Sequence, residues 1–305
     1  MKNKTYFVFF AVLAVVALGF SACNNPSLPL VADRDVPENG LNEALNWVYN
    51  SSRNNGTYNL KLSGDQEINS FYLSFNTIKN VTVTLSGVGG VKTIKLVGDR
   101  AHFGVAKNST LILEENITLL GHVGNTESLV VVNNGGMFVI NDGARITGND
   151  YAYMGSGIFV WEGGTVIMNG GEISEHTAGQ CGGGIYVWEG GIFEMNGGTI
   201  TGNIAKGGGG SGGGGVLVSG TFRMNGGFIS KNDATIREGG GVLVNTNGKF
   251  YITNGIIWGE GANANTASVG SVLSNTGLAQ FGIGDTWFPL ATTNTTIEVI
   301  DGVKQ

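Results

Sequence analysis

A short motif that returns about every 28 residues constrains the fold of this chain more than any other feature. The motif, Met-Asn-Gly-Gly or a degenerate form of it, begins at Leu113, Ile140, Met168, Met195, Met224 and Ile252. The intervals between successive copies are 27, 28, 27, 29 and 28 residues. Such a period in a glycine-rich, strand-like sequence is typical of a solenoid, in which each repeat forms one coil stacked on the preceding coil.

Aligned repeats show three columns of apolar residues, as expected for strands whose side chains alternate between core and solvent. Two columns lie two residues apart and contain Leu111, Phe138, Val166, Phe193, Phe222 and Phe250, and Leu113, Ile140, Met168, Met195, Met224 and Ile252. The third contains Leu119, Ile146, Ile173, Ile200, Ile229 and Ile257. We expect these side chains to point inward and to stack about 4.8 Å apart, the spacing between strands.

Glycine and asparagine columns predict the corners of each coil. Both residues enter the left-handed backbone region at low cost, and one corner column reads Asn116, Gly143, Gly171, Gly198, Gly227 and Gly255. Asparagines also recur as Asn141, Asn169, Asn196 and Asn225, and as Asn149, Asn203 and Asn232. These columns predict ladders in which side-chain amides join neighbouring coils. The sequence therefore predicts an all-β solenoid over residues 57–305, including a C-terminal cap.

Residues 1–22 are predicted to be a lipoprotein signal peptide. They carry Lys2 and Lys4, no acidic residue, and an apolar run from Tyr6 to Phe20 that is short for a membrane span. Ser-Ala-Cys follows, an arrangement in which Cys23 becomes the acylated N-terminus of the mature protein. Ordinary cleavage that leaves Cys23 free is the alternative. We expect attachment to a bacterial envelope through this lipid, at the outer membrane or cell surface rather than at the periplasmic face of the inner membrane.

Two segments are predicted between the signal peptide and the solenoid. Residues 23–38 contain three of the four prolines, which predicts an extended tether behind the lipidated cysteine. Residues 39–51 predict a short capping helix, because one helical face carries Leu41, Ala44, Leu45 and Val48. No proline occurs from Tyr58 to Phe288, which favours continuous strand pairing, since proline removes a ladder hydrogen bond.

Charge and cysteine usage bear on partners and cofactors. Without Lys2 and Lys4 the chain has 15 basic and 23 acidic residues, hence a formal charge of −8. No basic patch is visible, so we expect no nucleic-acid partner. The only other cysteine, Cys181, has no cluster of metal ligands at suitable spacing and is expected to be a buried or incidental thiol. No metal and no cofactor are therefore predicted.

The sharpest candidate for a binding site is a duplicated Trp-Glu-Gly-Gly, at Trp161–Gly164 and Trp188–Gly191. The two copies lie one coil apart, so Trp161 is expected to stack under Trp188. Strand alternation places an aromatic strip on the outside of the coils, formed by Phe159, Trp161, Tyr186 and Trp188. Such a strip can stack on sugar rings or dock a protein partner. The alternative is an aromatic ladder that only stabilises the sheet.

Catalytic chemistry has little support in the sequence. Glu162 and Glu189 are expected to stack about 5 Å apart, the carboxylate spacing of retaining glycosidases, and they are the only catalytic candidates. Nothing else marks an acid and a nucleophile. The three histidines, His102, His122 and His176, are assigned structural roles at unrelated positions.

The repeat unit Gly182–Asn203 resembles those of spirochaetal β-helix lipoproteins and, more distantly, of chlamydial polymorphic outer-membrane proteins. The stretches Gly40–Trp47, Asn80–Leu85 and Thr296–Gln305 fit the spirochaetal group as well. The resemblance implies a right-handed parallel β-helix of the pectin-lyase-like fold and a lipoprotein of the cell envelope. It implies no known activity, although some members of the group are described as adhesins.

These observations together predict a lipid-anchored cell-envelope module that binds glycan or protein ligands and lacks a catalytic site. Two alternatives remain open. One is a polysaccharide lyase or glycoside hydrolase on the same fold, and the other is a passive structural surface protein. The oligomeric state and the ligand are not specified by the sequence.

Overall fold

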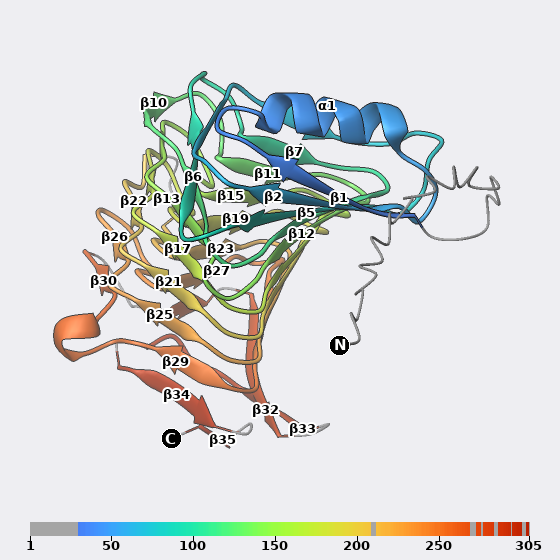
Figure 1. Ribbon diagram of the computed structural model, residues 1–305. Helices are drawn as coiled ribbons and strands as arrows, with labels where there is room; N and C mark the ends of the chain where they lie inside the picture. The colour runs from blue at the N-terminus through green and yellow to red at the C-terminus, as the bar shows by residue number, and fades with distance from the viewer. Residues whose placement is uncertain are drawn as a thin grey trace, which may run out of the picture.

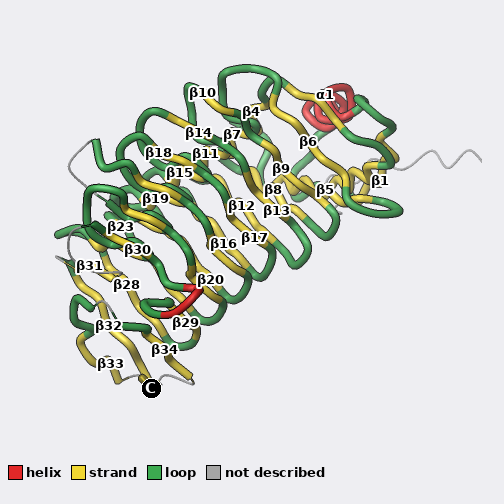
Figure 2. Tube along the Cα trace, turned by 90° about the vertical axis from the view of Figure 1, so that its left-hand side faces the viewer, coloured by secondary structure: helices red, strands yellow, loops and turns green. Residues whose placement is uncertain are grey.

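In its described residues the chain forms a parallel β-solenoid of about nine turns of roughly 27 residues each, with one α-helix. The computed structural model describes residues 30–208, 212–268, 273–275, 277–283, 286–293, 295–300 and 303–304. Figure 1 shows the strands of successive coils lying side by side, and Figure 2 shows the coils stacked along one axis. The predicted parallel β-helix is confirmed.

Two sheets form the longest walls of the solenoid. The 11-stranded sheet contains β1 (Val31–Val36), β2 (Thr57–Leu62), β5 (Val81–Gly87), β8 (Ser109–Leu113), β12 (Gly136–Ile140), β16 (Thr165–Met168), β20 (Ile192–Met195), β24 (Thr221–Met224), β28 (Lys249–Ile252), β32 (Leu278–Ile283) and β33 (Thr286–Pro289). The 10-stranded sheet contains β3 (Gln66–Ile68), β6 (Lys92–Leu96), β9 (Ile117–Leu120), β13 (Arg145–Thr147), β17 (Glu172–Ser174), β21 (Thr199–Thr201), β25 (Phe228–Ser230), β29 (Gly255–Ile257), β34 (Ile297–Ile300) and β35 (Val303–Lys304).

The other two sheets are built from shorter strands. The 8-stranded sheet contains β4 (Phe71–Leu73), β7 (Phe103–Val105), β11 (Val130–Val132), β15 (Ile158–Val160), β19 (Ile185–Val187), β23 (Val216–Val218), β27 (Val242–Val244) and β31 (Leu273–Asn275). The 6-stranded sheet contains β10 (Val123–Asn125), β14 (Asp150–Tyr151), β18 (Thr177–Ala178), β22 (Ile204–Ala205), β26 (Asp233–Ala234) and β30 (Thr266–Ala267). Each central coil visits the 8-, 11-, 10- and 6-stranded sheets in turn. The sequence did not predict the last of these sheets.

The predicted apolar columns are confirmed as files of buried side chains. Ile173 pairs with Ile200, and Ile200 with Ile229, so the third column lies in register along the 10-stranded sheet. In the 11-stranded sheet the ring of Phe222 stacks on Phe193 at 4.7 Å and on Phe250 at 4.9 Å between centroids. All three phenyl rings are fully buried. Burial of each such side chain contributes about 1.5–3 kcal/mol before conformational entropy is subtracted.

The corner column adopts the left-handed conformation that its residues predict. Gly171, Gly198 and Gly227 have φ of 75°, 85° and 90°, and Asn116 at the same corner has φ of 63°. A Cβ added to Gly198 would lie 2.7 Å from the carbonyl oxygen of Gly170, so the corner also requires glycine for close stacking of coils.

Both asparagine columns form ladders. The outer ladder is exposed: Asn169 donates to Asn141 at 2.9 Å and Asn196 donates to Asn169 at 2.9 Å. The inner ladder is buried: Asn203 donates to Asn232 at 2.9 Å and Asn232 donates to Asn265 at 2.8 Å. The outer ladder therefore lies along a solvated corner, whereas the inner ladder satisfies polar groups inside the protein.

The N-terminal end of the solenoid is closed by α1 (Leu41–Ser51), which lies across the first coils (Figure 1). Its predicted apolar face is buried, and the backbone N–H of Leu41 donates to the buried Gln66 side chain at 2.8 Å. The predicted tether is wrong for part of its length, because residues 31–36 form β1, which pairs in parallel with β2. Prolines flank this strand rather than interrupt it, so the backbone keeps its ladder hydrogen bonds. Cys23 lies outside the described residues.

The C-terminal end differs from the coils in strand direction. β34 pairs antiparallel with β29, and β33 pairs antiparallel with β32. The parallel stacking of the coils therefore gives way to antiparallel pairing at this end. Within the described ranges, no helix has the length and apolar character needed to cross a membrane.

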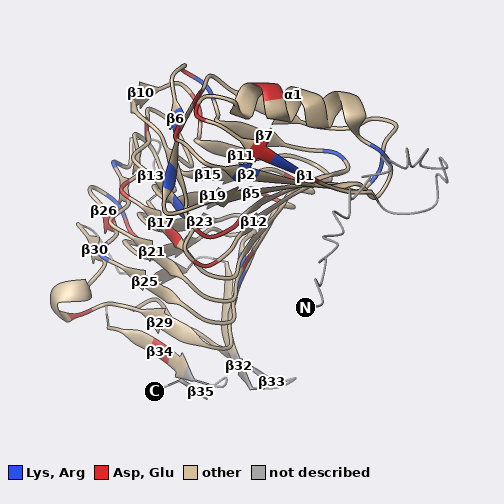
Figure 3. Cartoon of the chain, in the orientation of Figure 1, with Lys and Arg blue, Asp and Glu red and all other residues tan. Residues whose placement is uncertain are grey.

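Charged residues of both signs are interspersed along the coils (Figure 3). Neighbouring coils bring some of them into ion pairs, such as Arg145 with Glu172 at 3.0 Å and Arg223 with Glu194 at 3.5 Å. These pairs are partly solvent-exposed, so each contributes little to stability.

Candidate functional site

Trp161 and Trp188 lie at matching corners of adjacent coils, immediately after β15 and β19. Val160 pairs with Val187 in register, and the two indole centroids are 5.6 Å apart with the rings tilted by 52°. Trp161 is 42% exposed and Trp188 is 36% exposed. The predicted placement of Trp161 under Trp188 is confirmed, and one part of each indole is open to solvent.

The other half of the predicted aromatic strip is not exposed. Phe159 is only 7% exposed and Tyr186 only 5%. They form a satellite cluster outside the main core, whose members are Phe159, Cys181, Tyr186, Leu217 and Leu243. The prediction that Phe159 and Tyr186 lie on the surface is therefore wrong.

The chain that leads into β15 and β19 explains this burial. It passes over the outer face of the strands so closely that a Cβ on Gly155 would lie 3.0 Å from Cβ of Tyr186 and 3.2 Å from the Phe159 ring. The Cys181 thiol is enclosed in the same layer, and burial raises its pKa to about 12. Phe159 packs against Trp161 at 4.5 Å and Tyr186 against Trp188 at 5.5 Å between centroids. The buried rings thus support the exposed indoles from beneath.

Glu162 and Glu189 are exposed at the tips of the same two corners. Within the part of the chain that the structure describes, neither carboxylate makes a hydrogen bond or an ion pair. No neighbouring group distinguishes one as an acid and the other as a nucleophile. In the described ranges, no group of three or more His, Cys, Asp or Glu side chains is arranged to hold a metal ion.

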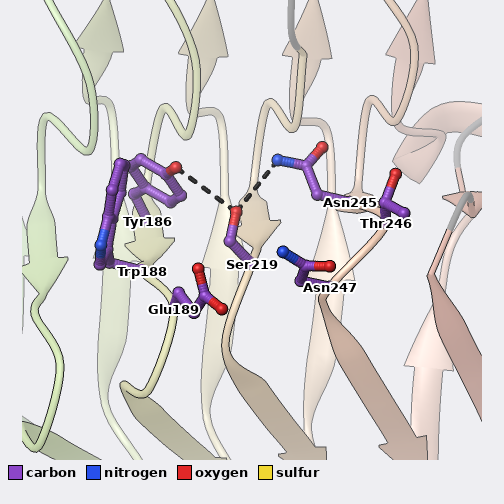
Figure 4. A pocket seen from close by; sticks show the side chains of 7 residues that line it. All are labelled: Tyr186, Trp188, Glu189, Ser219, Asn245, Thr246 and Asn247. Carbon is purple, nitrogen blue, oxygen red and sulfur yellow. Dashed lines mark hydrogen bonds between the residues drawn. The ribbon is translucent and has the colours of Figure 1, made fainter.

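Two hollows flank Trp188 on the outer surface. One, of about 390 Å³, is lined by Glu127, Ser128, Val131, Tyr151, Tyr153, Met154, Phe159, Trp161 and Trp188. The other, of about 290 Å³, is lined by Tyr186, Trp188, Glu189, Ser219, Asn245, Thr246 and Asn247 (Figure 4). We call the second hollow the notch. Sequence reasoning missed Ser219 and Asn245–Asn247, although the shorter corner at Ser219 was visible in the repeat alignment.

One part of the prediction for the histidines, their unrelated positions, is wrong. His122 and His176 do not occupy unrelated positions, because each stands three residues after a member of the third apolar column, as Asn149 and Asn203 do. His176 takes an asparagine's place in the buried ladder. Its Nδ1 accepts from the Asn149 N–H at 3.2 Å and its Nε2 donates to the Ile146 carbonyl at 3.0 Å. This arrangement requires the neutral imidazole.

Burial lowers the pKa of His176 from 6.5 to about 4, and the nearby Arg145 acts in the same direction. The unfolded chain therefore binds more protons than the folded protein between these two values. Stability is fully present above about pH 6.5 and falls as the pH drops toward about 4, below which this histidine has no further effect. The expected loss is on the order of 3 kcal/mol. Urea unfolding at a series of pH values measures it.

The variant His176→Asn isolates the contribution of His176 to the pH dependence of stability, because it places at this ladder position an asparagine, which does not titrate. His102, whose pKa burial lowers to about 3, destabilises the protein in acid in the same way and is unchanged in the variant. We expect the pH dependence between about 4 and 6.5 to become shallower in His176→Asn. An unchanged slope would contradict the assignment of a neutral, buried His176.

Comparisons with protein-family models, with curated proteins and with solved structures give no match to this chain.

Proposed function

We propose that this protein is a lipid-anchored binding module of a bacterial cell envelope, with a glycan or protein ligand held on the exposed indoles of Trp161 and Trp188. The observation that carries the proposal is the pair of half-exposed indoles, 5.6 Å apart, on a support of buried aromatic rings. Tryptophan is enriched among the residues that contribute most to binding energy. Rings that are already fixed lose little conformational entropy when a ligand binds.

The position of the indoles along the solenoid fits an anchored module. Trp161 lies beside β16, the sixth strand of the 11-stranded sheet counted from β1, and Trp188 lies beside β20, the seventh. Five strand spacings correspond to roughly 24 Å along the axis. A lipid on Cys23 is attached at the β1 end, so the indoles are displaced from the anchored end and remain accessible to a ligand.

Replacing both indoles is expected to weaken ligand binding at least roughly tenfold, because each removes more than about 1 kcal/mol of contact energy. The measurement is binding of the Trp161→Ala plus Trp188→Ala variant to an immobilised glycan panel and to extracellular-matrix proteins. Phe228→Ala is the matched control, since Phe228 is 47% exposed and lies on β25, a strand of a different sheet. Binding that survives in the double variant rejects this face as the site.

A further inference from the structure

The notch beside Trp188 arises from a difference in corner length between consecutive coils. Val187 pairs with Val218 and Val218 with Val244, whereas Ile192 pairs with Thr221 and Thr221 with Lys249. Four residues, 188–191 and 245–248, therefore form the outer corners, but only Ser219 and Gly220 form the corner between them. The middle corner is two residues shorter than its neighbours, so it leaves a depression one coil wide in the surface.

Walls and floor of the notch carry different chemistry. Trp188 and Glu189 stand on one wall, and Asn245, Thr246 and Asn247 form the other. The Ser219 hydroxyl on the floor accepts from Asn245 at 3.0 Å and lies 3.4 Å from the Tyr186 hydroxyl. Figure 4 shows the Glu189 carboxylate and the Asn247 amide on either side of Ser219. The walls are two coils apart, roughly 9.6 Å between backbones, which is wide enough to admit a flat ring between the side chains.

The lining selects for a ring that is apolar on one face and hydroxylated around its edge. The Trp188 indole offers an apolar surface, Glu189 accepts hydrogen bonds, and the amides of Asn245 and Asn247 both donate and accept. Among the residues that the structure describes, no Lys or Arg lines the notch. An acidic sugar would therefore place its carboxylate beside Glu189 without a compensating cation. Pockets of this kind orient a ligand with a few polar groups set around an apolar surface.

We propose that the notch is a subsite for one uncharged sugar ring of an oligosaccharide, a proposal that rests on the binding function assigned to the indoles. The ring stacks on Trp188 and its hydroxyls bond to Glu189, Asn245 and Asn247. The other hollow, of about 390 Å³, lies on the opposite side of Trp188, so the chain of sugars runs parallel to the solenoid axis. From the coil of Val131 to that of Asn245 there are four strand spacings, roughly 19 Å, which leaves room for neighbouring sugar units.

Calorimetric titration with neutral and acidic tetrasaccharides tests the subsite. The neutral probes are cellotetraose, mannotetraose and tetra-N-acetylchitotetraose, and the acidic probe is tetragalacturonate. We expect at least one neutral probe to bind the native protein more tightly than tetragalacturonate. Binding of the acidic probe alone, or of none of the four, overturns the assignment of an uncharged sugar.

Variants of the notch locate the binding. Inserting two residues between Ser219 and Gly220 restores a four-residue corner and fills the notch, so we expect at least roughly tenfold weaker binding. Asn247→Ala and Glu189→Gln test the same site without altering the backbone, with an expected loss of about threefold to tenfold each. Asn196→Ala is the matched control, because Asn196 is an exposed asparagine between β20 and β21, at a different corner of the Trp188 coil, and lines neither hollow.

The outcomes separate this inference from the function on which it rests. Loss of binding in Trp161→Ala plus Trp188→Ala, together with native affinity in Asn247→Ala, Glu189→Gln and the insertion variant, overturns the notch and leaves the indole face in place. Binding to a matrix protein but to no tetrasaccharide overturns the sugar class alone. Absence of any effect from either set of variants overturns both proposals. Circular dichroism of each variant identifies any that fail to fold. If the insertion variant fails to fold, Asn247→Ala and Glu189→Gln still test whether the notch binds the sugar.

Discussion

Replacing Phe222 by alanine is expected to lower the free energy of unfolding by about 3–5 kcal/mol. The ring is fully buried and lies between two others, at 4.7 Å from Phe193 and 4.9 Å from Phe250. Its removal leaves a cavity lined by both neighbours, and tight packing on either side limits how far the coils can relax. Urea denaturation followed by circular dichroism measures the change.

The control for this substitution is Phe228→Ala on the neighbouring sheet. Phe228 belongs to the same coil as Phe222, but its side chain faces solvent and is 47% exposed. We expect the free energy of unfolding to change by no more than about 0.5 kcal/mol, as for most surface positions. Equal losses in the two variants would show that burial in the phenylalanine file is not what stabilises these coils.

Asn232→Ala is expected to destabilise the protein by about 3 kcal/mol or more. The Asn232 side chain accepts from the backbone N–H and the amide of Asn203 at 3.0 and 2.9 Å. It also donates to the carbonyl of Ile200 at 2.9 Å and to the amide oxygen of Asn265 at 2.8 Å. Alanine leaves several of these buried groups without partners, and each unsatisfied group costs about 1–3 kcal/mol.

The outer ladder supplies the matched control, Asn196→Ala. Asn196 donates to Asn169 at 2.9 Å and accepts from Asn225 at 3.0 Å, but at an exposed corner where water replaces the lost partner. We expect a loss below about 1 kcal/mol, measured by the same urea denaturation. If both asparagine variants lose the same stability, water reaches the inner ladder and its burial is not the source of its effect.

The repeat period made most of the fold predictable. Because side chains one coil apart must lie in register, the columns containing Ile200 and Phe222 could be assigned to the core from their spacing alone. The left-handed corner at Gly198 followed from residue type. The fourth sheet was missed because two-residue strands such as Thr177–Ala178 are too short to show alternation. β1 was missed because prolines on either side favoured an irregular tether.

The candidate site was only partly predictable for a different reason. Alternation establishes which side of a strand a residue occupies, but it does not reveal what covers that side. Phe159 and Tyr186 were correctly directed away from the main core, yet the preceding segments fold over them. The ladder position of His176 was missed because histidine and asparagine share few sequence properties, although both offer a donor and an acceptor at similar reach. To predict the notch from the sequence, one has to compare the lengths of the corners between strands and not only the residue types.

The shortened corner at Ser219-Gly220 also has a consequence for how such a molecule can diversify. Two residues are missing there, yet Val218 and Thr221 still align with both neighbouring coils. Insertions and deletions at that edge therefore leave the hydrophobic files undisturbed. The surface proposed to bind a ligand can therefore be changed one corner at a time, by grafting or by natural variation, while the residues on which folding depends stay the same.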